Sequence, residues 1–171
     1  MSAVTRTYLA LGSNLGDRRA LLAAAREELQ KLASQPIESA ALYETAPWDC
    51  PPDSPPFLNT VLQLDTELPP MDLLARTQAI EEQLGRAAPA TRGRNAPRPI
   101  DIDLLVYGDR VMTSPELNLP HPRLHERLFV LYPLRDLAPT LIPPTHANPV
   151  SILLEICESI ETPPVRLADS W

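Results

Sequence analysis

The chain has 171 residues, 44% of them hydrophobic and 22% charged, with a formal net charge of -7. This length is typical of one domain with a substantial core. The acidic balance argues against a protein that coats nucleic acid, because such proteins are usually basic. No apolar run reaches membrane-spanning length and the N-terminus lacks a secretory pattern, so we expect a cytoplasmic protein with no membrane partner.

The first part of the chain alternates strand-like and helix-like patterns. Apolar residues at helical spacing mark the helices, Asp17 is a candidate N-cap, and Pro69-Pro70 is tolerated in a first helical turn. Alternating or continuous apolar runs mark the strands. The expected elements are a strand at 7–11, a helix at 18–34, strands at 37–45 and 57–66, and a helix from 69 to Gly85.

The second part begins with a strand at 100–107. A tight turn at Gly108-Asp109 is expected to form a hairpin with residues 110–112, followed by a helix over 122–137. A last helix is expected near 149–160, with Ile152, Ile156 and Ile160 as its buried stripe, and the remaining tail has no assignment.

This order predicts an α+β fold with a ferredoxin-like βαββαβ core, to which a hairpin strand and C-terminal helices are added. Its antiparallel or mixed sheet would carry helices on one face and leave the other free for ligands. We expect a single domain over 1–171, with a core at about 5–144 and a C-terminal helix and tail at 145–171.

Two aspartates lie on one face of the strand at 100–107. Side chains alternate along a strand, so Asp101 and Asp103 point the same way, opposite to Ile100, Ile102, Leu104 and Val106. Two adjacent carboxylates repel each other, and Mg²⁺, which binds one or two carboxylates together with phosphates, removes that repulsion. A solvated acidic face is the alternative interpretation.

The segment 86–135 contains eight arginines and five acidic residues, an excess of three positive charges in an acidic chain. Such a local cluster favours a compact anionic ligand. Lys31 is the only lysine, and neither a P-loop nor a Gly-x-Gly-x-x-Gly motif is present. Phosphate binding would therefore depend on arginine, metal and backbone groups.

Several motifs occur in an order that resembles the 6-hydroxymethyl-7,8-dihydropterin pyrophosphokinase family of folate biosynthesis. The resemblance covers nearly all of residues 5 to 144. Its motifs are Gly12-Ser13-Asn14-Leu15-Gly16, Phe57-Leu58-Asn59, Gln78-x-Ile80-Glu81 with Gly85-Arg86, Pro97-Arg98-x-Ile100-Asp101-Ile102-Asp103-Leu104-Leu105, and Pro120-His121-Pro122 with Arg127 and Phe129.

The resemblance implies transfer of the β,γ-diphosphate of ATP to the hydroxymethyl oxygen of the pterin, releasing AMP. It implies a monomer that uses two Mg²⁺ ions. Asp101 and Asp103 match the metal ligands, and Arg86 and Arg98 match groups that stabilise the transferred phosphates. One departure lies in the arginine loop, where Asn95-Ala96 replaces a Trp-Gly pair common in the family.

The resemblance also implies two sets of binding residues. The pterin set has two phenylalanines suited to stacking and an asparagine suited to the ring's amide edge: Thr45, Pro47, Trp48, Phe57, Asn59 and Phe129. The ATP set is Gln78, Glu81, Arg94, Arg98, Ile102, His121 and Arg127. A ferredoxin-like nucleotide- or RNA-binding module without catalysis remains the alternative.

Overall fold

The structure is a computed structural model of the chain and describes residues 3–47, 50–86 and 97–171. In chain order its elements are β1 (Thr5–Ser13), α1 (Arg18–Gln30), β2 (Glu38–Ser39), β3 (Leu42–Thr45), β4 (Phe57–Thr66), α2 (Pro70–Gln83), β5 (Asp101–Tyr107), β6 (Met112–Thr113), β7 (Asn118–Leu119), the 3-10 turn η2 (Leu124–Glu126), α3 (Leu128–Leu137), α4 (Val150–Glu158) and β8 (Val165–Ala168).

An antiparallel sheet forms the middle of the molecule, with the strand order β5-β1-β4-β3-β8. The central pair, β1 and β4, is aligned from Thr5 opposite Thr66 to Ser13 opposite Leu58. The expected mixed α+β architecture with an antiparallel sheet is therefore confirmed.

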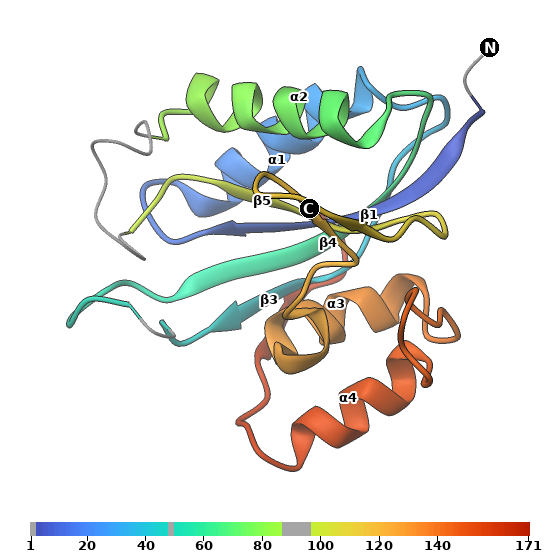
Figure 1. The fold of residues 1–171 in the computed structure, drawn as a ribbon. Coiled ribbons are helices and arrows are strands. Elements are labelled where there is room, and N and C mark those ends of the chain that lie inside the picture. The colour runs from blue at the N-terminus through green and yellow to red at the C-terminus, as the bar shows by residue number, and fades with distance from the viewer. Residues whose placement is uncertain (1–2, 48–49, 87–96) are drawn as a thin grey trace.

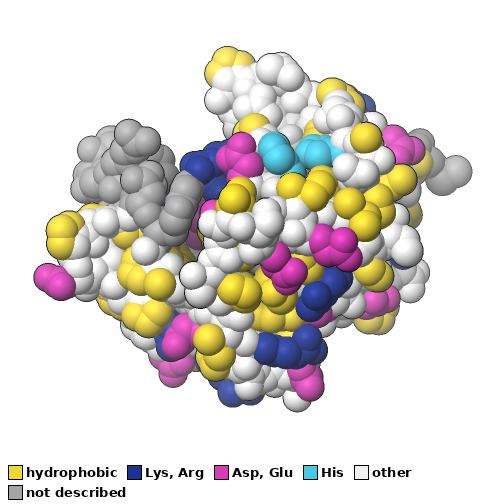
Figure 2. All heavy atoms as spheres, turned by 90° about the horizontal axis from the view of Figure 1, so that it is seen from below, with side chains coloured by type: hydrophobic (Ala, Val, Ile, Leu, Met, Phe, Trp, Pro, Cys, Tyr) yellow, Lys and Arg dark blue, Asp and Glu magenta, His cyan; other side chains and the backbone are white. Residues whose placement is uncertain are grey.

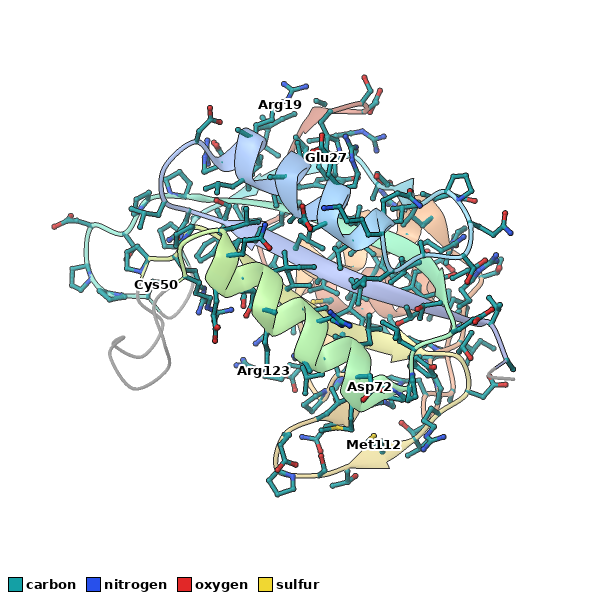
Figure 3. The ribbon with its side chains drawn as sticks, turned by 90° about the horizontal axis from the view of Figure 1, so that it is seen from above. Arg19, Glu27, Cys50, Asp72, Met112 and Arg123 are labelled. Carbon is teal, nitrogen blue, oxygen red and sulfur yellow. The ribbon has the colours of Figure 1, made fainter. Side chains whose placement is uncertain are left out.

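Helices cover both faces of the sheet, so the expectation of one free face was wrong (Figure 1). The helices α1 and α2 lie side by side over one face (Figure 3). There Leu22 and Leu73 pack against Leu62 of β4. On the other face α3 and α4 contribute a second core, which includes Val61 and Leu131. Both faces of β4 are buried, since Leu62 and Leu64 lie in the first core and Val61 lies in the second.

A bulge interrupts the alternation predicted for β5. Leu9 pairs with Leu104 and Tyr8 with Val106, which leaves Leu105 as an extra residue in β5. Beyond it the faces exchange, so Val106 lies in the second core, opposite to the prediction, and Tyr107 lies in the first core. Asp101 and Asp103 precede the bulge and keep their common face.

The segment after β5 differs from the predicted hairpin. The amide of Arg110 donates to the carbonyl of Tyr107, which closes a turn, but β6 pairs with β7 rather than with β5. The helix expected over 122–137 is also divided. Arg127 has extended backbone angles (φ -122, ψ 106), so η2 ends before it and α3 begins after it.

The buried face of α4 is not the one predicted. Ile152, Ile156 and Ile160 are 37%, 56% and 81% exposed. The buried side chains follow the i, i+3, i+4, i+7 pattern and are Val150, Leu153, Leu154 and Cys157. Seen from below, hydrophobic side chains are exposed among charged ones on this side of the molecule (Figure 2).

The tail that had no assignment adds a strand to the sheet. β8 pairs antiparallel with β3, with Tyr43 opposite Arg166. The indole Nε1 of Trp171 donates to the carbonyl of Ala40 at 3.0 Å. Within the described ranges, no helix has both the length and the apolar character needed to cross a membrane.

Candidate active site

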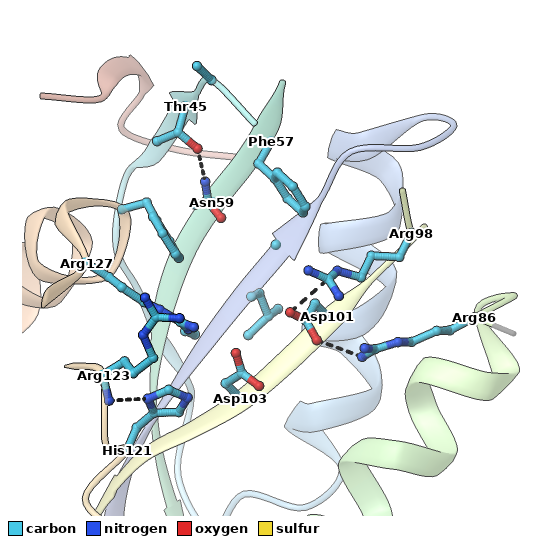
Figure 4. A pocket seen from close by; sticks show the side chains of 15 residues that line it. Thr45, Phe57, Asn59, Arg86, Arg98, Asp101, Asp103, His121, Arg123 and Arg127 are labelled. Atoms are coloured by element: carbon cyan, nitrogen blue, oxygen red, sulfur yellow. Dashed lines mark hydrogen bonds and ion pairs between the residues drawn. The ribbon is translucent and has the colours of Figure 1, made fainter. Parts of the chain in front are cut away.

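A cavity of about 340 Å³ opens at the end of the sheet where β1 finishes and β4 and β5 begin (Figure 4). Apolar, amide, carboxylate and arginine groups meet in it. Its lining residues are Ala10, Leu11, Gly12, Thr45, Ala46, Phe57, Asn59, Arg86, Arg98, Asp101, Asp103, His121, Arg123, Arg127 and Phe129.

Strand register brings the two halves of the cavity together at Gly12. Gly12 pairs with Asn59 of β4 on one side and with Asp101 of β5 on the other. A Cβ atom at this position would lie 3.0 Å from Oδ1 of Asn59 and 3.5 Å from Cδ1 of Phe57. The missing side chain therefore leaves room for both of these groups.

One part of the cavity holds four of the residues predicted for the pterin. The Nδ2 of Asn59 donates to Oγ1 of Thr45 at 2.7 Å, which fixes the amide orientation. Phe57 and Phe129 both line the cavity, each with an arginine near its ring. Pro47 is half-buried outside the lining, and Trp48 lies outside the described residues.

The other part of the cavity is an ionic cluster centred on Asp101. The Nη1 of Arg86 donates to Oε1 of Glu81 at 2.6 Å and to Oδ1 of Asp101 at 2.7 Å. The Nε of Arg98 lies 3.7 Å from Oδ2 of Asp101. Among the groups that the structure describes, the buried Nε atoms of Arg86, Arg98 and Arg127 have no hydrogen-bond partner, so each retains donor capacity for an anion.

Glu81 joins α2 to β5 from a buried position. Its Oε1 also accepts a hydrogen bond from the amide of Ile102 at 2.7 Å. Burial raises its pKa to about 7, although the charge of Arg86 acts in the opposite direction. The resemblance placed Glu81 in the ATP set, and the structure places it in the ionic cluster. The side chain of Ile102 belongs to the core, so only its backbone faces this cluster.

The Asp101 and Asp103 pair has the donor chemistry expected for Mg²⁺. Burial and the neighbouring charge of Asp101 raise the pKa of Asp103 to about 7, so a bound cation would relieve an unfavourable charge. No cluster of three or more His, Cys, Asp or Glu ligands occurs in the described part of the chain. Two carboxylates with the remaining ligands from phosphate and water fit Mg²⁺ rather than a fully protein-bound metal.

His121 presents a neutral imidazole to the cavity. Its Nδ1 accepts a hydrogen bond from the amide of Arg123 at 3.1 Å, so the neutral ring carries its proton on Nε2. Burial, followed by the charge of Arg127, lowers its pKa to about 4. The Nε2–H group is therefore a donor over the whole neutral range.

The remaining predicted positions are partly accounted for. Arg127 lines the cavity, whereas Gln78 is exposed on α2 outside the lining, and Arg94 lies outside the described residues. Arg123 also lines the cavity but was not selected from the sequence. Its spacing of one helical turn from Arg127 was the available signal.

Asn14 positions the loop that carries Arg98. The side-chain Oδ1 of Asn14 accepts from the backbone amide of Arg98 at 2.8 Å, and the backbone amide of Asn14 donates to the carbonyl of Arg98 at 3.2 Å. Its Nδ2 donates to the carbonyl of Pro55 at 3.3 Å. Asn14 thus acts on the cavity indirectly, by joining the loops that precede β4 and β5.

A sequence model of the family described as 7,8-dihydro-6-hydroxymethylpterin-pyrophosphokinase (HPPK) matches residues 8–139. The chain belongs to the HPPK family. This confirms the resemblance found in the motifs and the expectation of a pyrophosphokinase-type enzyme. Residues 140–171, which include α4 and β8, lie beyond the matched segment.

HPPK relatives are similar over most of the chain. The 2-amino-4-hydroxy-6-hydroxymethyldihydropteridine pyrophosphokinase of Porphyromonas gingivalis is 50% identical over 138 residues, which cover 80% of this chain and 92% of the relative. The enzyme of the same name from Pseudomonas aeruginosa is 42% identical, with 81% and 83% covered. The folic acid synthesis protein fol1 of Schizosaccharomyces pombe is 37% identical over 96% of this chain but only 22% of its own length.

Solved structures support the fold. The crystal structure of Plasmodium falciparum HPPK-DHPS with pteroate aligns with a TM-score of 0.71 over 93% of this chain, at 17% identity. The chain covers 43% of that longer protein. A structure of the same protein with SDX-DHP gives a TM-score of 0.74 at 15% identity. At these identities the likeness shows a common fold and nothing more specific.

Proposed function

We propose that this HPPK-family chain transfers the diphosphate group of ATP to 6-hydroxymethyl-7,8-dihydropterin in folate biosynthesis. The products would be AMP and the pterin diphosphate. The single observation that carries the proposal is a cavity that joins two kinds of surface. One is the amide and phenyl surface of Asn59, Phe57 and Phe129, and the other is the carboxylate and arginine cluster around Asp101.

The amide and phenyl surface suits a flat heteroaromatic ring. The rings of Phe57 and Phe129 offer stacking partners, and Asn59 offers both a donor and an acceptor for an amide edge. The bond from Asn59 to Thr45 fixes which atom of the amide faces the ring. These side chains would orient the hydroxymethyl group toward Asp101 and Asp103.

The ionic cluster suits a polyphosphate with its metal. Asp101 and Asp103 would hold two Mg²⁺ ions, which supply charge neutralisation and alignment of the triphosphate. Arg86 and Arg98 neutralise Asp101 here and have free Nε donors for phosphate oxygens, as has Arg127. The Nε2–H of His121 would add a neutral donor.

The reaction makes one P–O bond and breaks one P–O bond, and one proton is released. The hydroxymethyl oxygen bonds to the β-phosphorus and loses its proton to solvent, while the bond from that phosphorus to the α,β-bridging oxygen breaks and AMP departs. Arginine donors around a buried site stabilise the charge that spreads over the transferred group.

Finer aspects of the fold are part of the same proposal. The strand order β5-β1-β4-β3, with α1 and α2 on one face, supports a ferredoxin-like βαββαβ core. A single domain over 1–171, a monomeric state, a cytoplasmic location and the absence of nucleic-acid partners stay predictions from the sequence.

Product analysis tests the proposed function. With ATP, Mg²⁺ and the hydroxymethyl pterin we expect AMP in amounts equal to the pterin diphosphate, and no turnover after chelation by EDTA. Asp101→Asn and Asp103→Asn should each lower kcat at least about 100-fold, since each removes one charge of the metal site. Formation of ADP, or wild-type rates in either variant, would refute the proposal.

A further inference from the structure

The hydroxyl of Tyr43 connects β3, α3 and the C-terminal strand. Tyr43 is 2% exposed and donates to Oδ2 of Asp136 on α3 at 2.8 Å. Nη1 of Arg166 on β8 donates to the same hydroxyl at 3.1 Å and to Oδ1 of Asp136 at 3.3 Å. We call Tyr43, Asp136 and Arg166 the clamp.

One face of α3 carries both a cavity residue and the clamp. Phe129, Tyr132 and Asp136 are spaced i, i+3, i+7 and therefore project from the same side of the helix. Phe129 lines the cavity, and the ring of Tyr132 lies 5.8 Å from that of Tyr43. The contact between Asp136 and Tyr43 thus fixes the face of α3 that presents Phe129.

The helix lacks one internal hydrogen bond at Phe129. Pro133 lies within α3 and has no amide proton, so the carbonyl of Phe129, four residues earlier, lacks its intrahelical donor. The turn that carries Phe129 therefore depends more on contacts outside the helix. The clamp lies one to two turns further along the same face.

The opposite wall of the cavity is built on the strands that the clamp also holds. Tyr43 pairs with Asn59 across β3 and β4, and Thr45, two residues on, bonds to Asn59. The Tyr43–Asp136 bond therefore spans the gap between the strands that carry Asn59 and the helix that carries Phe129. Burial, reinforced by the bond to Asp136, raises the pKa of Tyr43 to about 12, which keeps the hydroxyl a donor at neutral pH.

The third member of the clamp comes from the tail beyond the matched family segment. β8 places Arg166 opposite Tyr43. The tail is anchored after that point, because Trp171 donates to the carbonyl of Ala40 and Arg19 donates to the carbonyl of Ser170 at 3.0 Å. Arg26 also lies over the Trp171 ring at 4.2 Å.

We propose that Tyr43, Asp136 and Arg166 are positioning residues that set the width of the pterin part of the cavity by fixing α3 against β3. The proposal rests on the proposed function, because it assigns the pterin to the space between Phe129 and Asn59. The clamp bonds to none of Arg86, Arg98, Asp101 and Asp103. Arg127 of the ATP set directly precedes α3, so clamp variants should weaken binding of the pterin more than binding of the nucleotide.

Binding measurements on clamp variants test this. Tyr43→Phe removes only the hydroxyl, and Arg166→Gln changes a half-exposed side chain without altering the core. The Kd of the pterin, measured by fluorescence with Mg²⁺ and a non-hydrolysable ATP analogue present, should rise about 3- to 10-fold in Tyr43→Phe, the equivalent of one lost hydrogen bond. The Kd of the analogue should change less than about twofold. Arg166→Gln should shift the pterin Kd in the same direction by a smaller factor.

Asp65→Asn is the matched control. It disrupts an ion pair between Arg6 and Asp65 at the opposite end of the β1–β4 ladder from Gly12 and Asn59. It should leave both dissociation constants at wild-type values. A wild-type pterin Kd in both clamp variants, or equal weakening of both ligands, would overturn the clamp alone. Failure of the wild-type protein to bind the pterin would instead overturn the proposed function and the clamp with it.

Discussion

His121 shows how single residues acquire their chemistry from their surroundings. An ordinary histidine titrates near neutral pH, but burial and Arg127 lower the pKa of His121 to about 4. The amide of Arg123 also selects its tautomer. The sequence predicted a nucleotide contact at this position, but neither the charge state nor the proton position can be inferred without the packing around it.

This lowered pKa predicts a pH-dependent stability. Between about pH 4 and 6.5 the unfolded chain binds a proton that the folded His121 does not, so its contribution to stability is complete above that window and is lost as pH falls. His121→Asn keeps an acceptor for Arg123 but does not titrate. We compare the free energies of unfolding of the wild type and of this variant. The wild-type value minus the variant value should fall by about 1–2 kcal/mol from pH 7 to pH 5.

Denaturant titrations of both proteins at each pH measure this difference. Between pH 7 and pH 8 the difference should stay constant, since His121 is neutral in both folded and unfolded chains there. Comparison with the variant cancels the opposite trend expected from Glu81, whose pKa is raised. A difference that stays constant down to pH 5 would contradict the assigned environment of His121.

Adding a methyl group at Gly12 tests whether the absence of a side chain there leaves room for Asn59. In Gly12→Ala the new Cβ would lie 3.0 Å from Oδ1 of Asn59, so the amide must shift. We expect the KM for the pterin to rise about 3- to 10-fold, as for one impaired hydrogen bond. Steady-state kinetics in the Asn59→Ala background provide the control, because the methyl group should have little further effect there. If Gly12→Ala raised the KM by the same factor in both backgrounds, its effect would not depend on the amide of Asn59.

Among the elements, β5 shows that the direction of side chains along a strand can be predicted from the sequence only while the strand is regular. Strict alternation placed Asp101 and Asp103 on one face, and the strand keeps that arrangement until the bulge at Leu105. A bulge depends on the register with β1, which is a long-range property. The same reason explains why β8 was missed, since a four-residue edge strand is defined by its partner β3 rather than by its own pattern.

The helix α4 shows a second limit of prediction from the sequence, because its residues form two apolar stripes and either stripe could be the buried one. The wider stripe is buried, and Ile156 is 56% exposed whereas Leu154 is 2% exposed. Ile156→Lys should therefore change the free energy of unfolding by no more than about 0.5 kcal/mol, while Leu154→Ala should cost about 2–4 kcal/mol. Denaturant unfolding of the two variants decides between the stripes. A larger loss for Ile156→Lys would mean that the face predicted from the sequence is the buried one.

At the scale of the whole molecule, the sheet gathers into one cavity residues that lie far apart in the chain. Thr45, Asn59, Asp103 and Phe129 come from β3, β4, β5 and α3. The motifs named most of these residues through their resemblance to HPPK. Burial of Glu81, the contribution of Arg123 and the cover supplied by α3 and α4 could not be predicted, because each depends on tertiary packing.

The transfer of two phosphates as one unit is the central claim, and labelled ATP tests it most directly. The enzyme is incubated with the hydroxymethyl pterin, Mg²⁺ and ATP that carries ³²P in either the α or the γ position. Diphosphate transfer predicts that the γ label appears in the pterin product and that the α label stays entirely in AMP. Recovery of the α label in ADP, or of the γ label as free phosphate with unchanged pterin, would contradict it.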